Sequence, residues 1–286
     1  MGFTSVFTLL CAVIAACSYI IYTSDGKFAE LQLADAANSQ IVSPVYLLAL
    51  RVTFFLSSLF VATYIYFDKP ITITVNLNNN GDTKKLPIQY SERYYAFTLW
   101  CWTLLVVYFF LACICSIDFI FMTSYISKEL LSFTWVLYEL VFSTSYLVSS
   151  IVTFVLIPGG KAKGIPVDVF FKNTALFVHN FNIIFILIET LLNNLKFNFW
   201  HFPYVMLYGC IYVVFAWRLY WRKGFFIYFF LEYNRDYAVF FHIGLMVVLT
   251  IFYIVGCYIS WLKESHNVMI NTAIIVGSMF VLKFKE

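Results

Sequence analysis

Four ionisable side chains stand out within otherwise apolar stretches of this sequence: Arg51, Glu139, His179 and Glu189. A charged side chain at the centre of a bilayer is costly unless it is paired or faces a polar cavity. A histidine is suited to proton transfer near neutral pH, because its pKa lies close to that value. These residues are therefore the first candidates for a site. A structural ion pair between Arg51 and one of the two carboxylates is the alternative.

Two polar stripes carry most of these candidates. At 100° per residue, each stripe occupies a sector of about 80–100° on one helix face. The stripe in residues 171–192 and just beyond consists of Lys172, His179, Asn182, Glu189 and Asn193, and the stripe in residues 131–157 consists of Glu139, Ser143, Tyr146, Ser150 and Thr153. We expect the stripes to face each other, either across a polar cavity or in a dry helix interface. The residues predicted to line a substrate cavity are Arg51, Glu139, Asn182 and Glu189.

The elements that hold these residues are long apolar runs. Of the 286 residues, 62% are hydrophobic and 12% are charged, whereas a soluble domain carries about 25% charged residues. The runs reach the ~20 residues that a bilayer-spanning helix needs. We predict an all-α membrane protein, a polytopic bundle of about 7–8 transmembrane helices. The expected spans are residues 3–22, 41–67, 96–117, 131–157, 171–192, 203–221, 237–262 and the short final run 267–282.

Loop charges predict the orientation of this bundle. The loops 68–95, 158–172 and 218–236 each hold three or four Lys or Arg, and the intervening loops hold one each. Cytoplasmic loops are enriched in these residues near helix ends. The three positive loops should therefore share the cytoplasmic side, or its organellar equivalent. If the final run crosses, both chain ends lie on that side too.

The longest positive loop contains a pattern typical of a β-hairpin. Residues 71–77 and 84–90 alternate in polarity around the turn residues 78–82. Pro87 restricts the second strand to an edge position. Because an isolated hairpin is marginal in water, we expect this small cytoplasmic-side hairpin to pack on the helical body.

The sequence divides into three regions and excludes several function classes. Residues 1–40 form an N-terminal transmembrane helix and loop, 41–262 the helical core, and 263–286 a short C-terminal hydrophobic segment. The net charge of +3 includes no basic block, so no nucleic-acid partner is indicated. Neither a cofactor nor a metal site is expected, because the seven cysteines all lie in apolar runs and no phosphate-binding loop occurs. Membrane lipids are the expected surroundings. The endomembrane system, the plasma membrane and the mitochondrial inner membrane all stay open.

Short motifs in a consistent order give a family resemblance. They are FTLW at 97–100 followed by VYFFL at 107–111, VHN at 178–180 with ILIE at 186–189, and IYFFLE at 227–232. Over residues 90–262 the chain resembles the androgen-induced membrane hydrolases of fatty acid esters of hydroxy fatty acids, and the related rolling stone proteins. WVLY at 135–138 and YVVF at 212–215 are closer to the rolling stone branch.

The resemblance implies a catalytic pair. In the hydrolase branch an intramembrane threonine and a histidine are essential, and the matching positions here are Thr98 and His179. A threonine hydroxyl is a poor nucleophile unless an imidazole within about 3 Å takes its proton. The resemblance thus implies a Thr/His-dependent hydrolase of lipid esters. The alternatives are a non-catalytic multipass protein, either a rolling-stone-like factor or an accessory subunit of a larger membrane complex, and a carrier for a small anion or lipid.

Overall fold

The computed structural model describes residues 2–24, 31–77, 83–264 and 267–285. The predicted turn at 78–82 and the loop charge Lys27 lie outside these residues. Within them, seven helical segments are long and apolar enough to cross a membrane. They are α1 (Gly2–Thr23), α3 (Pro44–Phe67), α4 (Phe97–Phe121), α5 continuing into α6 (Lys128–Ala162), α7 continuing into α8 (Asn173–Leu192), the segment ending in α9 (Phe199–Lys223) and α10 (Ala238–Lys263). The chain is a multi-pass integral membrane protein, and the predicted fold class is confirmed.

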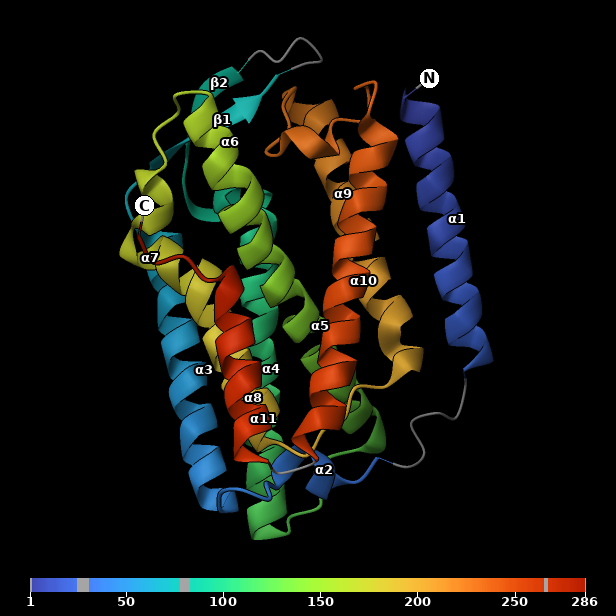
Figure 1. The fold of residues 1–286 in the computed structure, drawn as a ribbon, viewed down its shortest axis with the longest axis vertical. Helices are drawn as coiled ribbons and strands as arrows, with labels where there is room; N and C mark the ends of the chain where they lie inside the picture. Colours follow the sequence, from blue (N-terminus) through green and yellow to red (C-terminus); the bar gives the residue numbers. More distant parts are fainter. Residues whose placement is uncertain (1, 25–30, 78–82, 265–266, 286) are drawn as a thin grey trace.

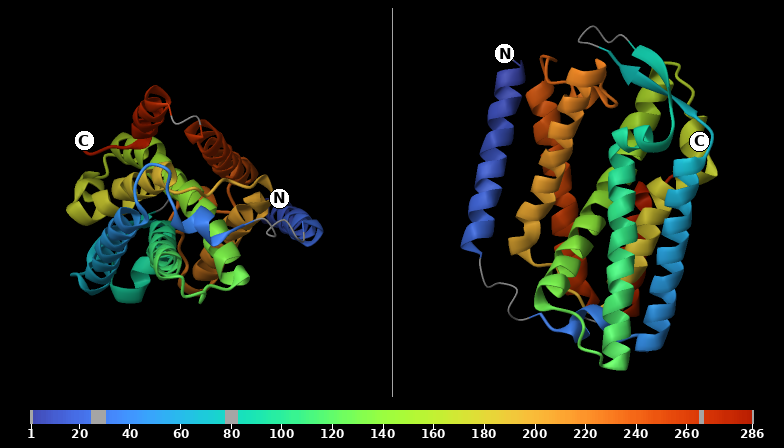
Figure 2. Two further views of the ribbon diagram at one scale, coloured as in Figure 1. Left: turned by 90° about the horizontal axis from the view of Figure 1, so that it is seen from below. Right: turned by 180° about the vertical axis from the view of Figure 1, so that it is seen from behind.

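Successive long helices alternate in direction (Figures 1 and 2). The hairpin, the connection from α6 to α7 and the connection from α9 to α10 all lie at the same end as the start of α1. The three loops rich in Lys and Arg therefore share one end of the bundle, which we call the positive end. The short helix α2 (Leu33–Ala37) lies at the opposite end.

The final apolar run forms the short helix α11 (Val268–Ser278), extended by one turn of 3-10 helix, Met279–Val281. Residues 268–281 reach about 21 Å at 1.5 Å per residue, less than the ~30 Å hydrocarbon core of a bilayer. By length, this run does not cross. The chain end lies against the helix that holds Asn180, whose side-chain amide donates to the carbonyl oxygen of Lys283 at 2.8 Å.

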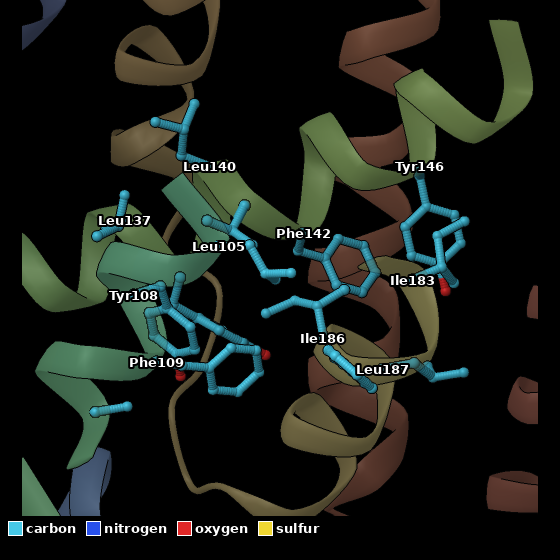
Figure 3. Close-up of a cluster of buried hydrophobic side chains, with 14 of the residues drawn as sticks. Leu105, Tyr108, Phe109, Leu137, Leu140, Phe142, Tyr146, Ile183, Ile186 and Leu187 are labelled. Carbon is cyan, nitrogen blue, oxygen red and sulfur yellow. The ribbon is translucent and has the colours of Figure 1, made fainter. Parts of the chain in front are cut away.

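The interior of the bundle lies between α4, α5 and α8 (Asn182–Leu192) (Figure 3). Leu105, Tyr108, Leu137 and Ile186 are buried there, from all three helices. Every residue of α5 from Leu137 to Ser150 is buried, so α5 is the central helix. Large apolar side chains on α1, α3 and α10 remain exposed, as expected where lipid covers the protein.

The strands β1 (Ile71–Asn76) and β2 (Thr83–Ile88) pair in antiparallel register, with Pro87 opposite Thr72. Val75 is fully buried against Leu219 and Phe225. The backbone N–H of Asn76 donates to the carbonyl oxygen of Phe226 at 2.9 Å, and the reverse bond is 2.8 Å. The hairpin therefore packs on the helical body, as predicted, and is tied to the segment between α9 and α10.

Candidate functional site

Thr98 lies in the first turn of α4 and lines an apolar cavity of about 780 Å³. The cavity is open to the exterior of the protein, and α4, α5, α9 (Phe202–Lys223) and α10 form its walls. Tyr228, Phe230 and Leu231 form its cover at the positive end. Among the described residues, the side chains that bring a polar group to this lining are Thr98, Tyr212, Tyr228 and His242, together with the thiol of Cys210. We call this space the Thr98 cavity.

The Thr98 cavity exists because α5 and α10 diverge towards the positive end (Figure 1). The two helices approach closely further down, where the rings of Tyr146 and Phe252 lie 5.5 Å apart. Nearby, Gly256 admits the ring of Phe197, since a Cβ on this glycine would lie 2.4 Å from it. Between this contact and the positive end, both helices contribute residues to the lining of the cavity. These residues lie within 147–156 and 242–249.

Tyr228 connects Thr98 to the cover of the cavity. Burial raises the pKa of Tyr228 to about 12, and a hydrogen bond with the Thr98 side chain acts in the opposite direction. The tyrosine is therefore a neutral hydroxyl at physiological pH. Behind it, an ion pair between Glu232 and Arg235, 2.5 Å between Oε2 and Nε, braces the same segment.

His242 lies one turn into α10, with its ring buried at the lining of the Thr98 cavity. Its Nδ1 is 2.8 Å from the carbonyl oxygen of Ala238. Because a carbonyl only accepts, Nδ1 carries the hydrogen and Nε2 carries a lone pair. Nε2 is buried and has no hydrogen-bond partner among the described residues. The sequence indicated only that this histidine lies near one end of an apolar run, so it was absent from the predicted site.

His179 lies in a π-helical turn, Phe177–Phe181, between α7 and α8. Its backbone carbonyl accepts a hydrogen bond from the Ser149 hydroxyl, and its ring lies 6.1 Å from that of Phe170. The Nδ1 atom is buried and lacks a partner within the described ranges. His179 does not contribute to the lining of the Thr98 cavity. The cavity therefore brings Thr98 together with His242 rather than with His179.

Arg51 and Glu189 form a fully buried ion pair, 2.5 Å between Nη2 and Oε1. The guanidinium also donates to Ser116 Oγ at 2.6 Å and to the carbonyl oxygen of Ala36 at 2.8 Å. The carboxylate also accepts from the Tyr108 hydroxyl at 2.8 Å. Both charges are occupied by protein groups, and neither residue lines the Thr98 cavity. The geometry is that of a structural pair joining α3, α4 and α8.

Glu139 is the centre of a second buried network. It accepts from the backbone N–H of Asn198 at 2.7 Å and from the Tyr253 hydroxyl at 2.8 Å, and it lies 3.0 Å from Nδ1 of His201. This carboxylate joins α5 to α10 and to the start of α9, and it too lies outside the lining of the Thr98 cavity. From the sequence, we expected His201 in a loop. The apolar run that follows it was the signal that a helix begins close to this residue.

One residue of the 171–192 stripe contacts α5, but through Ser145 and Ser149, which are not members of the predicted stripe there. Asn182 lies against α5, where Ser149 Oγ donates to Asn182 Oδ1 and Asn182 Nδ2 donates to the Ser145 carbonyl oxygen, both at 3.4 Å. His179 and Glu189 do not share a helix face, because the π-helical turn between them inserts an extra residue per turn. Counting at 100° per residue fails across such a turn. Asn182 does not line the Thr98 cavity.

The described residues contain no group of three or more His, Cys, Asp or Glu side chains that could hold a metal ion. Lys263, which sequence analysis did not single out, is buried and donates to the carbonyl oxygens of Thr190, Asn193 and Leu195 at 2.7–3.0 Å. It caps the C-terminal end of α8. No protein-family model, curated protein or solved structure matches this chain.

Proposed function

We propose that this chain is a membrane hydrolase of lipid esters, which holds the acyl chain of its substrate in the Thr98 cavity. The observation that carries the proposal is the position of the Thr98 hydroxyl on the wall of an open, apolar cavity between membrane-spanning helices. Two of the segments that carry the family resemblance, residues 97–100 and 227–232, supply the wall and the cover of this cavity. A lipid would enter sideways where α5 and α10 diverge.

In this reaction Thr98 Oγ forms a bond to the ester carbonyl carbon, and a base takes its proton. The tetrahedral intermediate expels the alcohol, which receives that proton, and water then releases the acid from the acyl-threonine. Tyr228, which interacts with the Thr98 side chain, would orient the hydroxyl before attack. The resemblance assigns the base to His179, which lies outside the cavity lining, so the proton path is part of the proposal to be tested.

The test is hydrolysis of a hydroxy-fatty-acid ester by the purified protein in lipid nanodiscs, followed as released fatty acid. Thr98→Val keeps the shape of the side chain and removes the hydroxyl, so turnover should fall at least about a hundredfold. Thr103→Val is the matched control on the same helix, because its hydroxyl donates to the backbone oxygen of Leu99 and lies outside the cavity lining. Equal turnover of wild type and Thr98→Val would refute the proposal.

A second function, a non-catalytic multipass protein that binds lipid or serves in a larger membrane complex, is supported by the placement of His179. If the two residues implied as a catalytic pair do not meet, the cavity can still bind an acyl chain without cleaving it. The expected result is then lipid in the cavity and no ester turnover by the wild type. Turnover by the wild type therefore separates the two functions. Where turnover occurs, His179→Gln lowers it only if this histidine takes part in the reaction.

A further inference from the structure

His242 lines the Thr98 cavity and carries a buried hydrogen-bond acceptor without a partner among the described residues. The Ala238 carbonyl oxygen, 2.8 Å away, holds the hydrogen of the ring on Nδ1. Nε2 then has a lone pair and no hydrogen to donate. The side chain is 2% exposed, and Nε2 has no partner in the part of the chain that the structure describes. A buried acceptor without a partner is unfavourable, and the cavity is where a partner can enter.

The other polar groups of the lining are already engaged. The Tyr212 hydroxyl donates to the carbonyl oxygen of Tyr95 at 2.6 Å, and Thr98 and Tyr228 interact with each other. The remaining lining is apolar apart from the thiol of Cys210. The group left to select a ligand is therefore Nε2 of His242. An O–H or N–H satisfies it, whereas an ether or ester oxygen does not, since both atoms would be acceptors.

We infer that the Thr98 cavity takes a single-chain amphiphile whose head group donates a hydrogen bond to His242, as a long-chain alcohol or a monoacylglycerol does. A single chain suits this space, because it is apolar and confined between four helices. The inference rests on the proposal that this cavity holds a lipid, but it does not depend on hydrolysis.

A donor from the protein itself is the competing explanation. The ring of Trp217 lies 6.2 Å from that of His242, centroid to centroid, and its indole N–H is also buried without a partner among the described residues. If a small rotation let the Trp217 N–H donate to His242 Nε2, that acceptor would be occupied. The cavity would then have no preference for a ligand that donates a hydrogen bond. The experiment below separates the two cases.

The probes are 1-dodecanol and its isomer 1-methoxyundecane, which have the same atoms but differ in the O–H. Both compete against a diazirine-tagged dodecanol for crosslinking to the full-length protein in phosphatidylcholine nanodiscs, with concentrations corrected for partition into lipid. An unmade hydrogen bond to a buried group corresponds to about a tenfold loss of affinity. The alcohol should therefore compete about tenfold better than the ether.

His242→Phe removes the acceptor and keeps a ring, so the two probes should compete equally. His242→Gln supplies a side-chain carbonyl and should restore part of the preference. Thr103→Val is the control outside the cavity lining and should retain the tenfold ratio. Equal competition in the wild type, no crosslinking to cavity residues, or a preference that survives His242→Phe overturns the inference. Ester turnover without the alcohol preference defeats this inference alone, and the preference without turnover defeats the hydrolase proposal alone.

Discussion

Replacing Arg51 by methionine tests the buried ion pair directly. The substitution leaves the Glu189 carboxylate in a site with no exposed surface and without its cation. It also removes the donors to Ser116 Oγ and to two backbone carbonyl oxygens, those of Ala36 and Ala112. Removing one partner of a buried pair costs roughly 3–5 kcal/mol, so Arg51→Met should lower the free energy of unfolding by that amount.

In the Arg51→Met background, we expect the second substitution, Glu189→Gln, to raise the free energy of unfolding instead of lowering it further. The glutamine carries no charge, and its oxygen still accepts from the Tyr108 hydroxyl, which is 2.8 Å from the native carboxylate. Only neutral hydrogen bonds are then lost, at about 1 kcal/mol each. The double variant should therefore be more stable than Arg51→Met alone, although it contains one more substitution.

The assay is reversible unfolding in mixed micelles with increasing dodecyl sulfate, followed by the fluorescence of the seven tryptophans. Arg222→Met is the control, because Arg222 is exposed at the end of α9 and surface substitutions change stability by roughly 0.5 kcal/mol or less. A double variant less stable than Arg51→Met, or an Arg51→Met protein as stable as the Arg222→Met control, would refute the reasoning.

Three further predictions concern the Glu139 network, the packing at Gly256 and the membrane topology. Glu139→Leu removes the acceptor shared by three groups, the Asn198 N–H, the Tyr253 hydroxyl and the His201 ring. It should lower the unfolding free energy by about 2–4 kcal/mol in the same assay, whereas Glu139→Gln should cost less than half of that. Gly256→Ala puts a methyl group 2.4 Å from an aromatic ring and should cost about 1–3 kcal/mol; Gly244→Ala, which meets nothing within 4 Å, should be neutral or stabilising by about 0.5–1 kcal/mol. In sealed vesicles, cysteines introduced at Lys85 and Lys196 should react with an impermeant maleimide from opposite sides, and labelling of both from one side would contradict the topology.

Several features followed from the sequence because they depend on local, additive properties. The expected span 41–67 and the observed helix Pro44–Phe67 end at the same residue, because Asp68 and Lys69 close an apolar run. The hairpin followed from alternation around a turn, and its packing followed from the instability of an isolated hairpin in water. The charge alternation of the loops followed in the same way. None of these needs knowledge of which helices are neighbours.

The tertiary structure decided which polar groups meet. From the sequence, either Glu139 or Glu189 could pair with Arg51. The packing of α3 against α4 and α8 places Arg51 beside Glu189, and Glu139 pairs with His201 instead. His179 was separated from the face of Glu189 by a π-helical turn that has no signature in the local composition. His242 entered the candidate site because α5 and α10 diverge above their contact. Hydrophobicity determines that a segment enters the membrane, but the rotation and partners of a helix depend on side chains from distant parts of the chain.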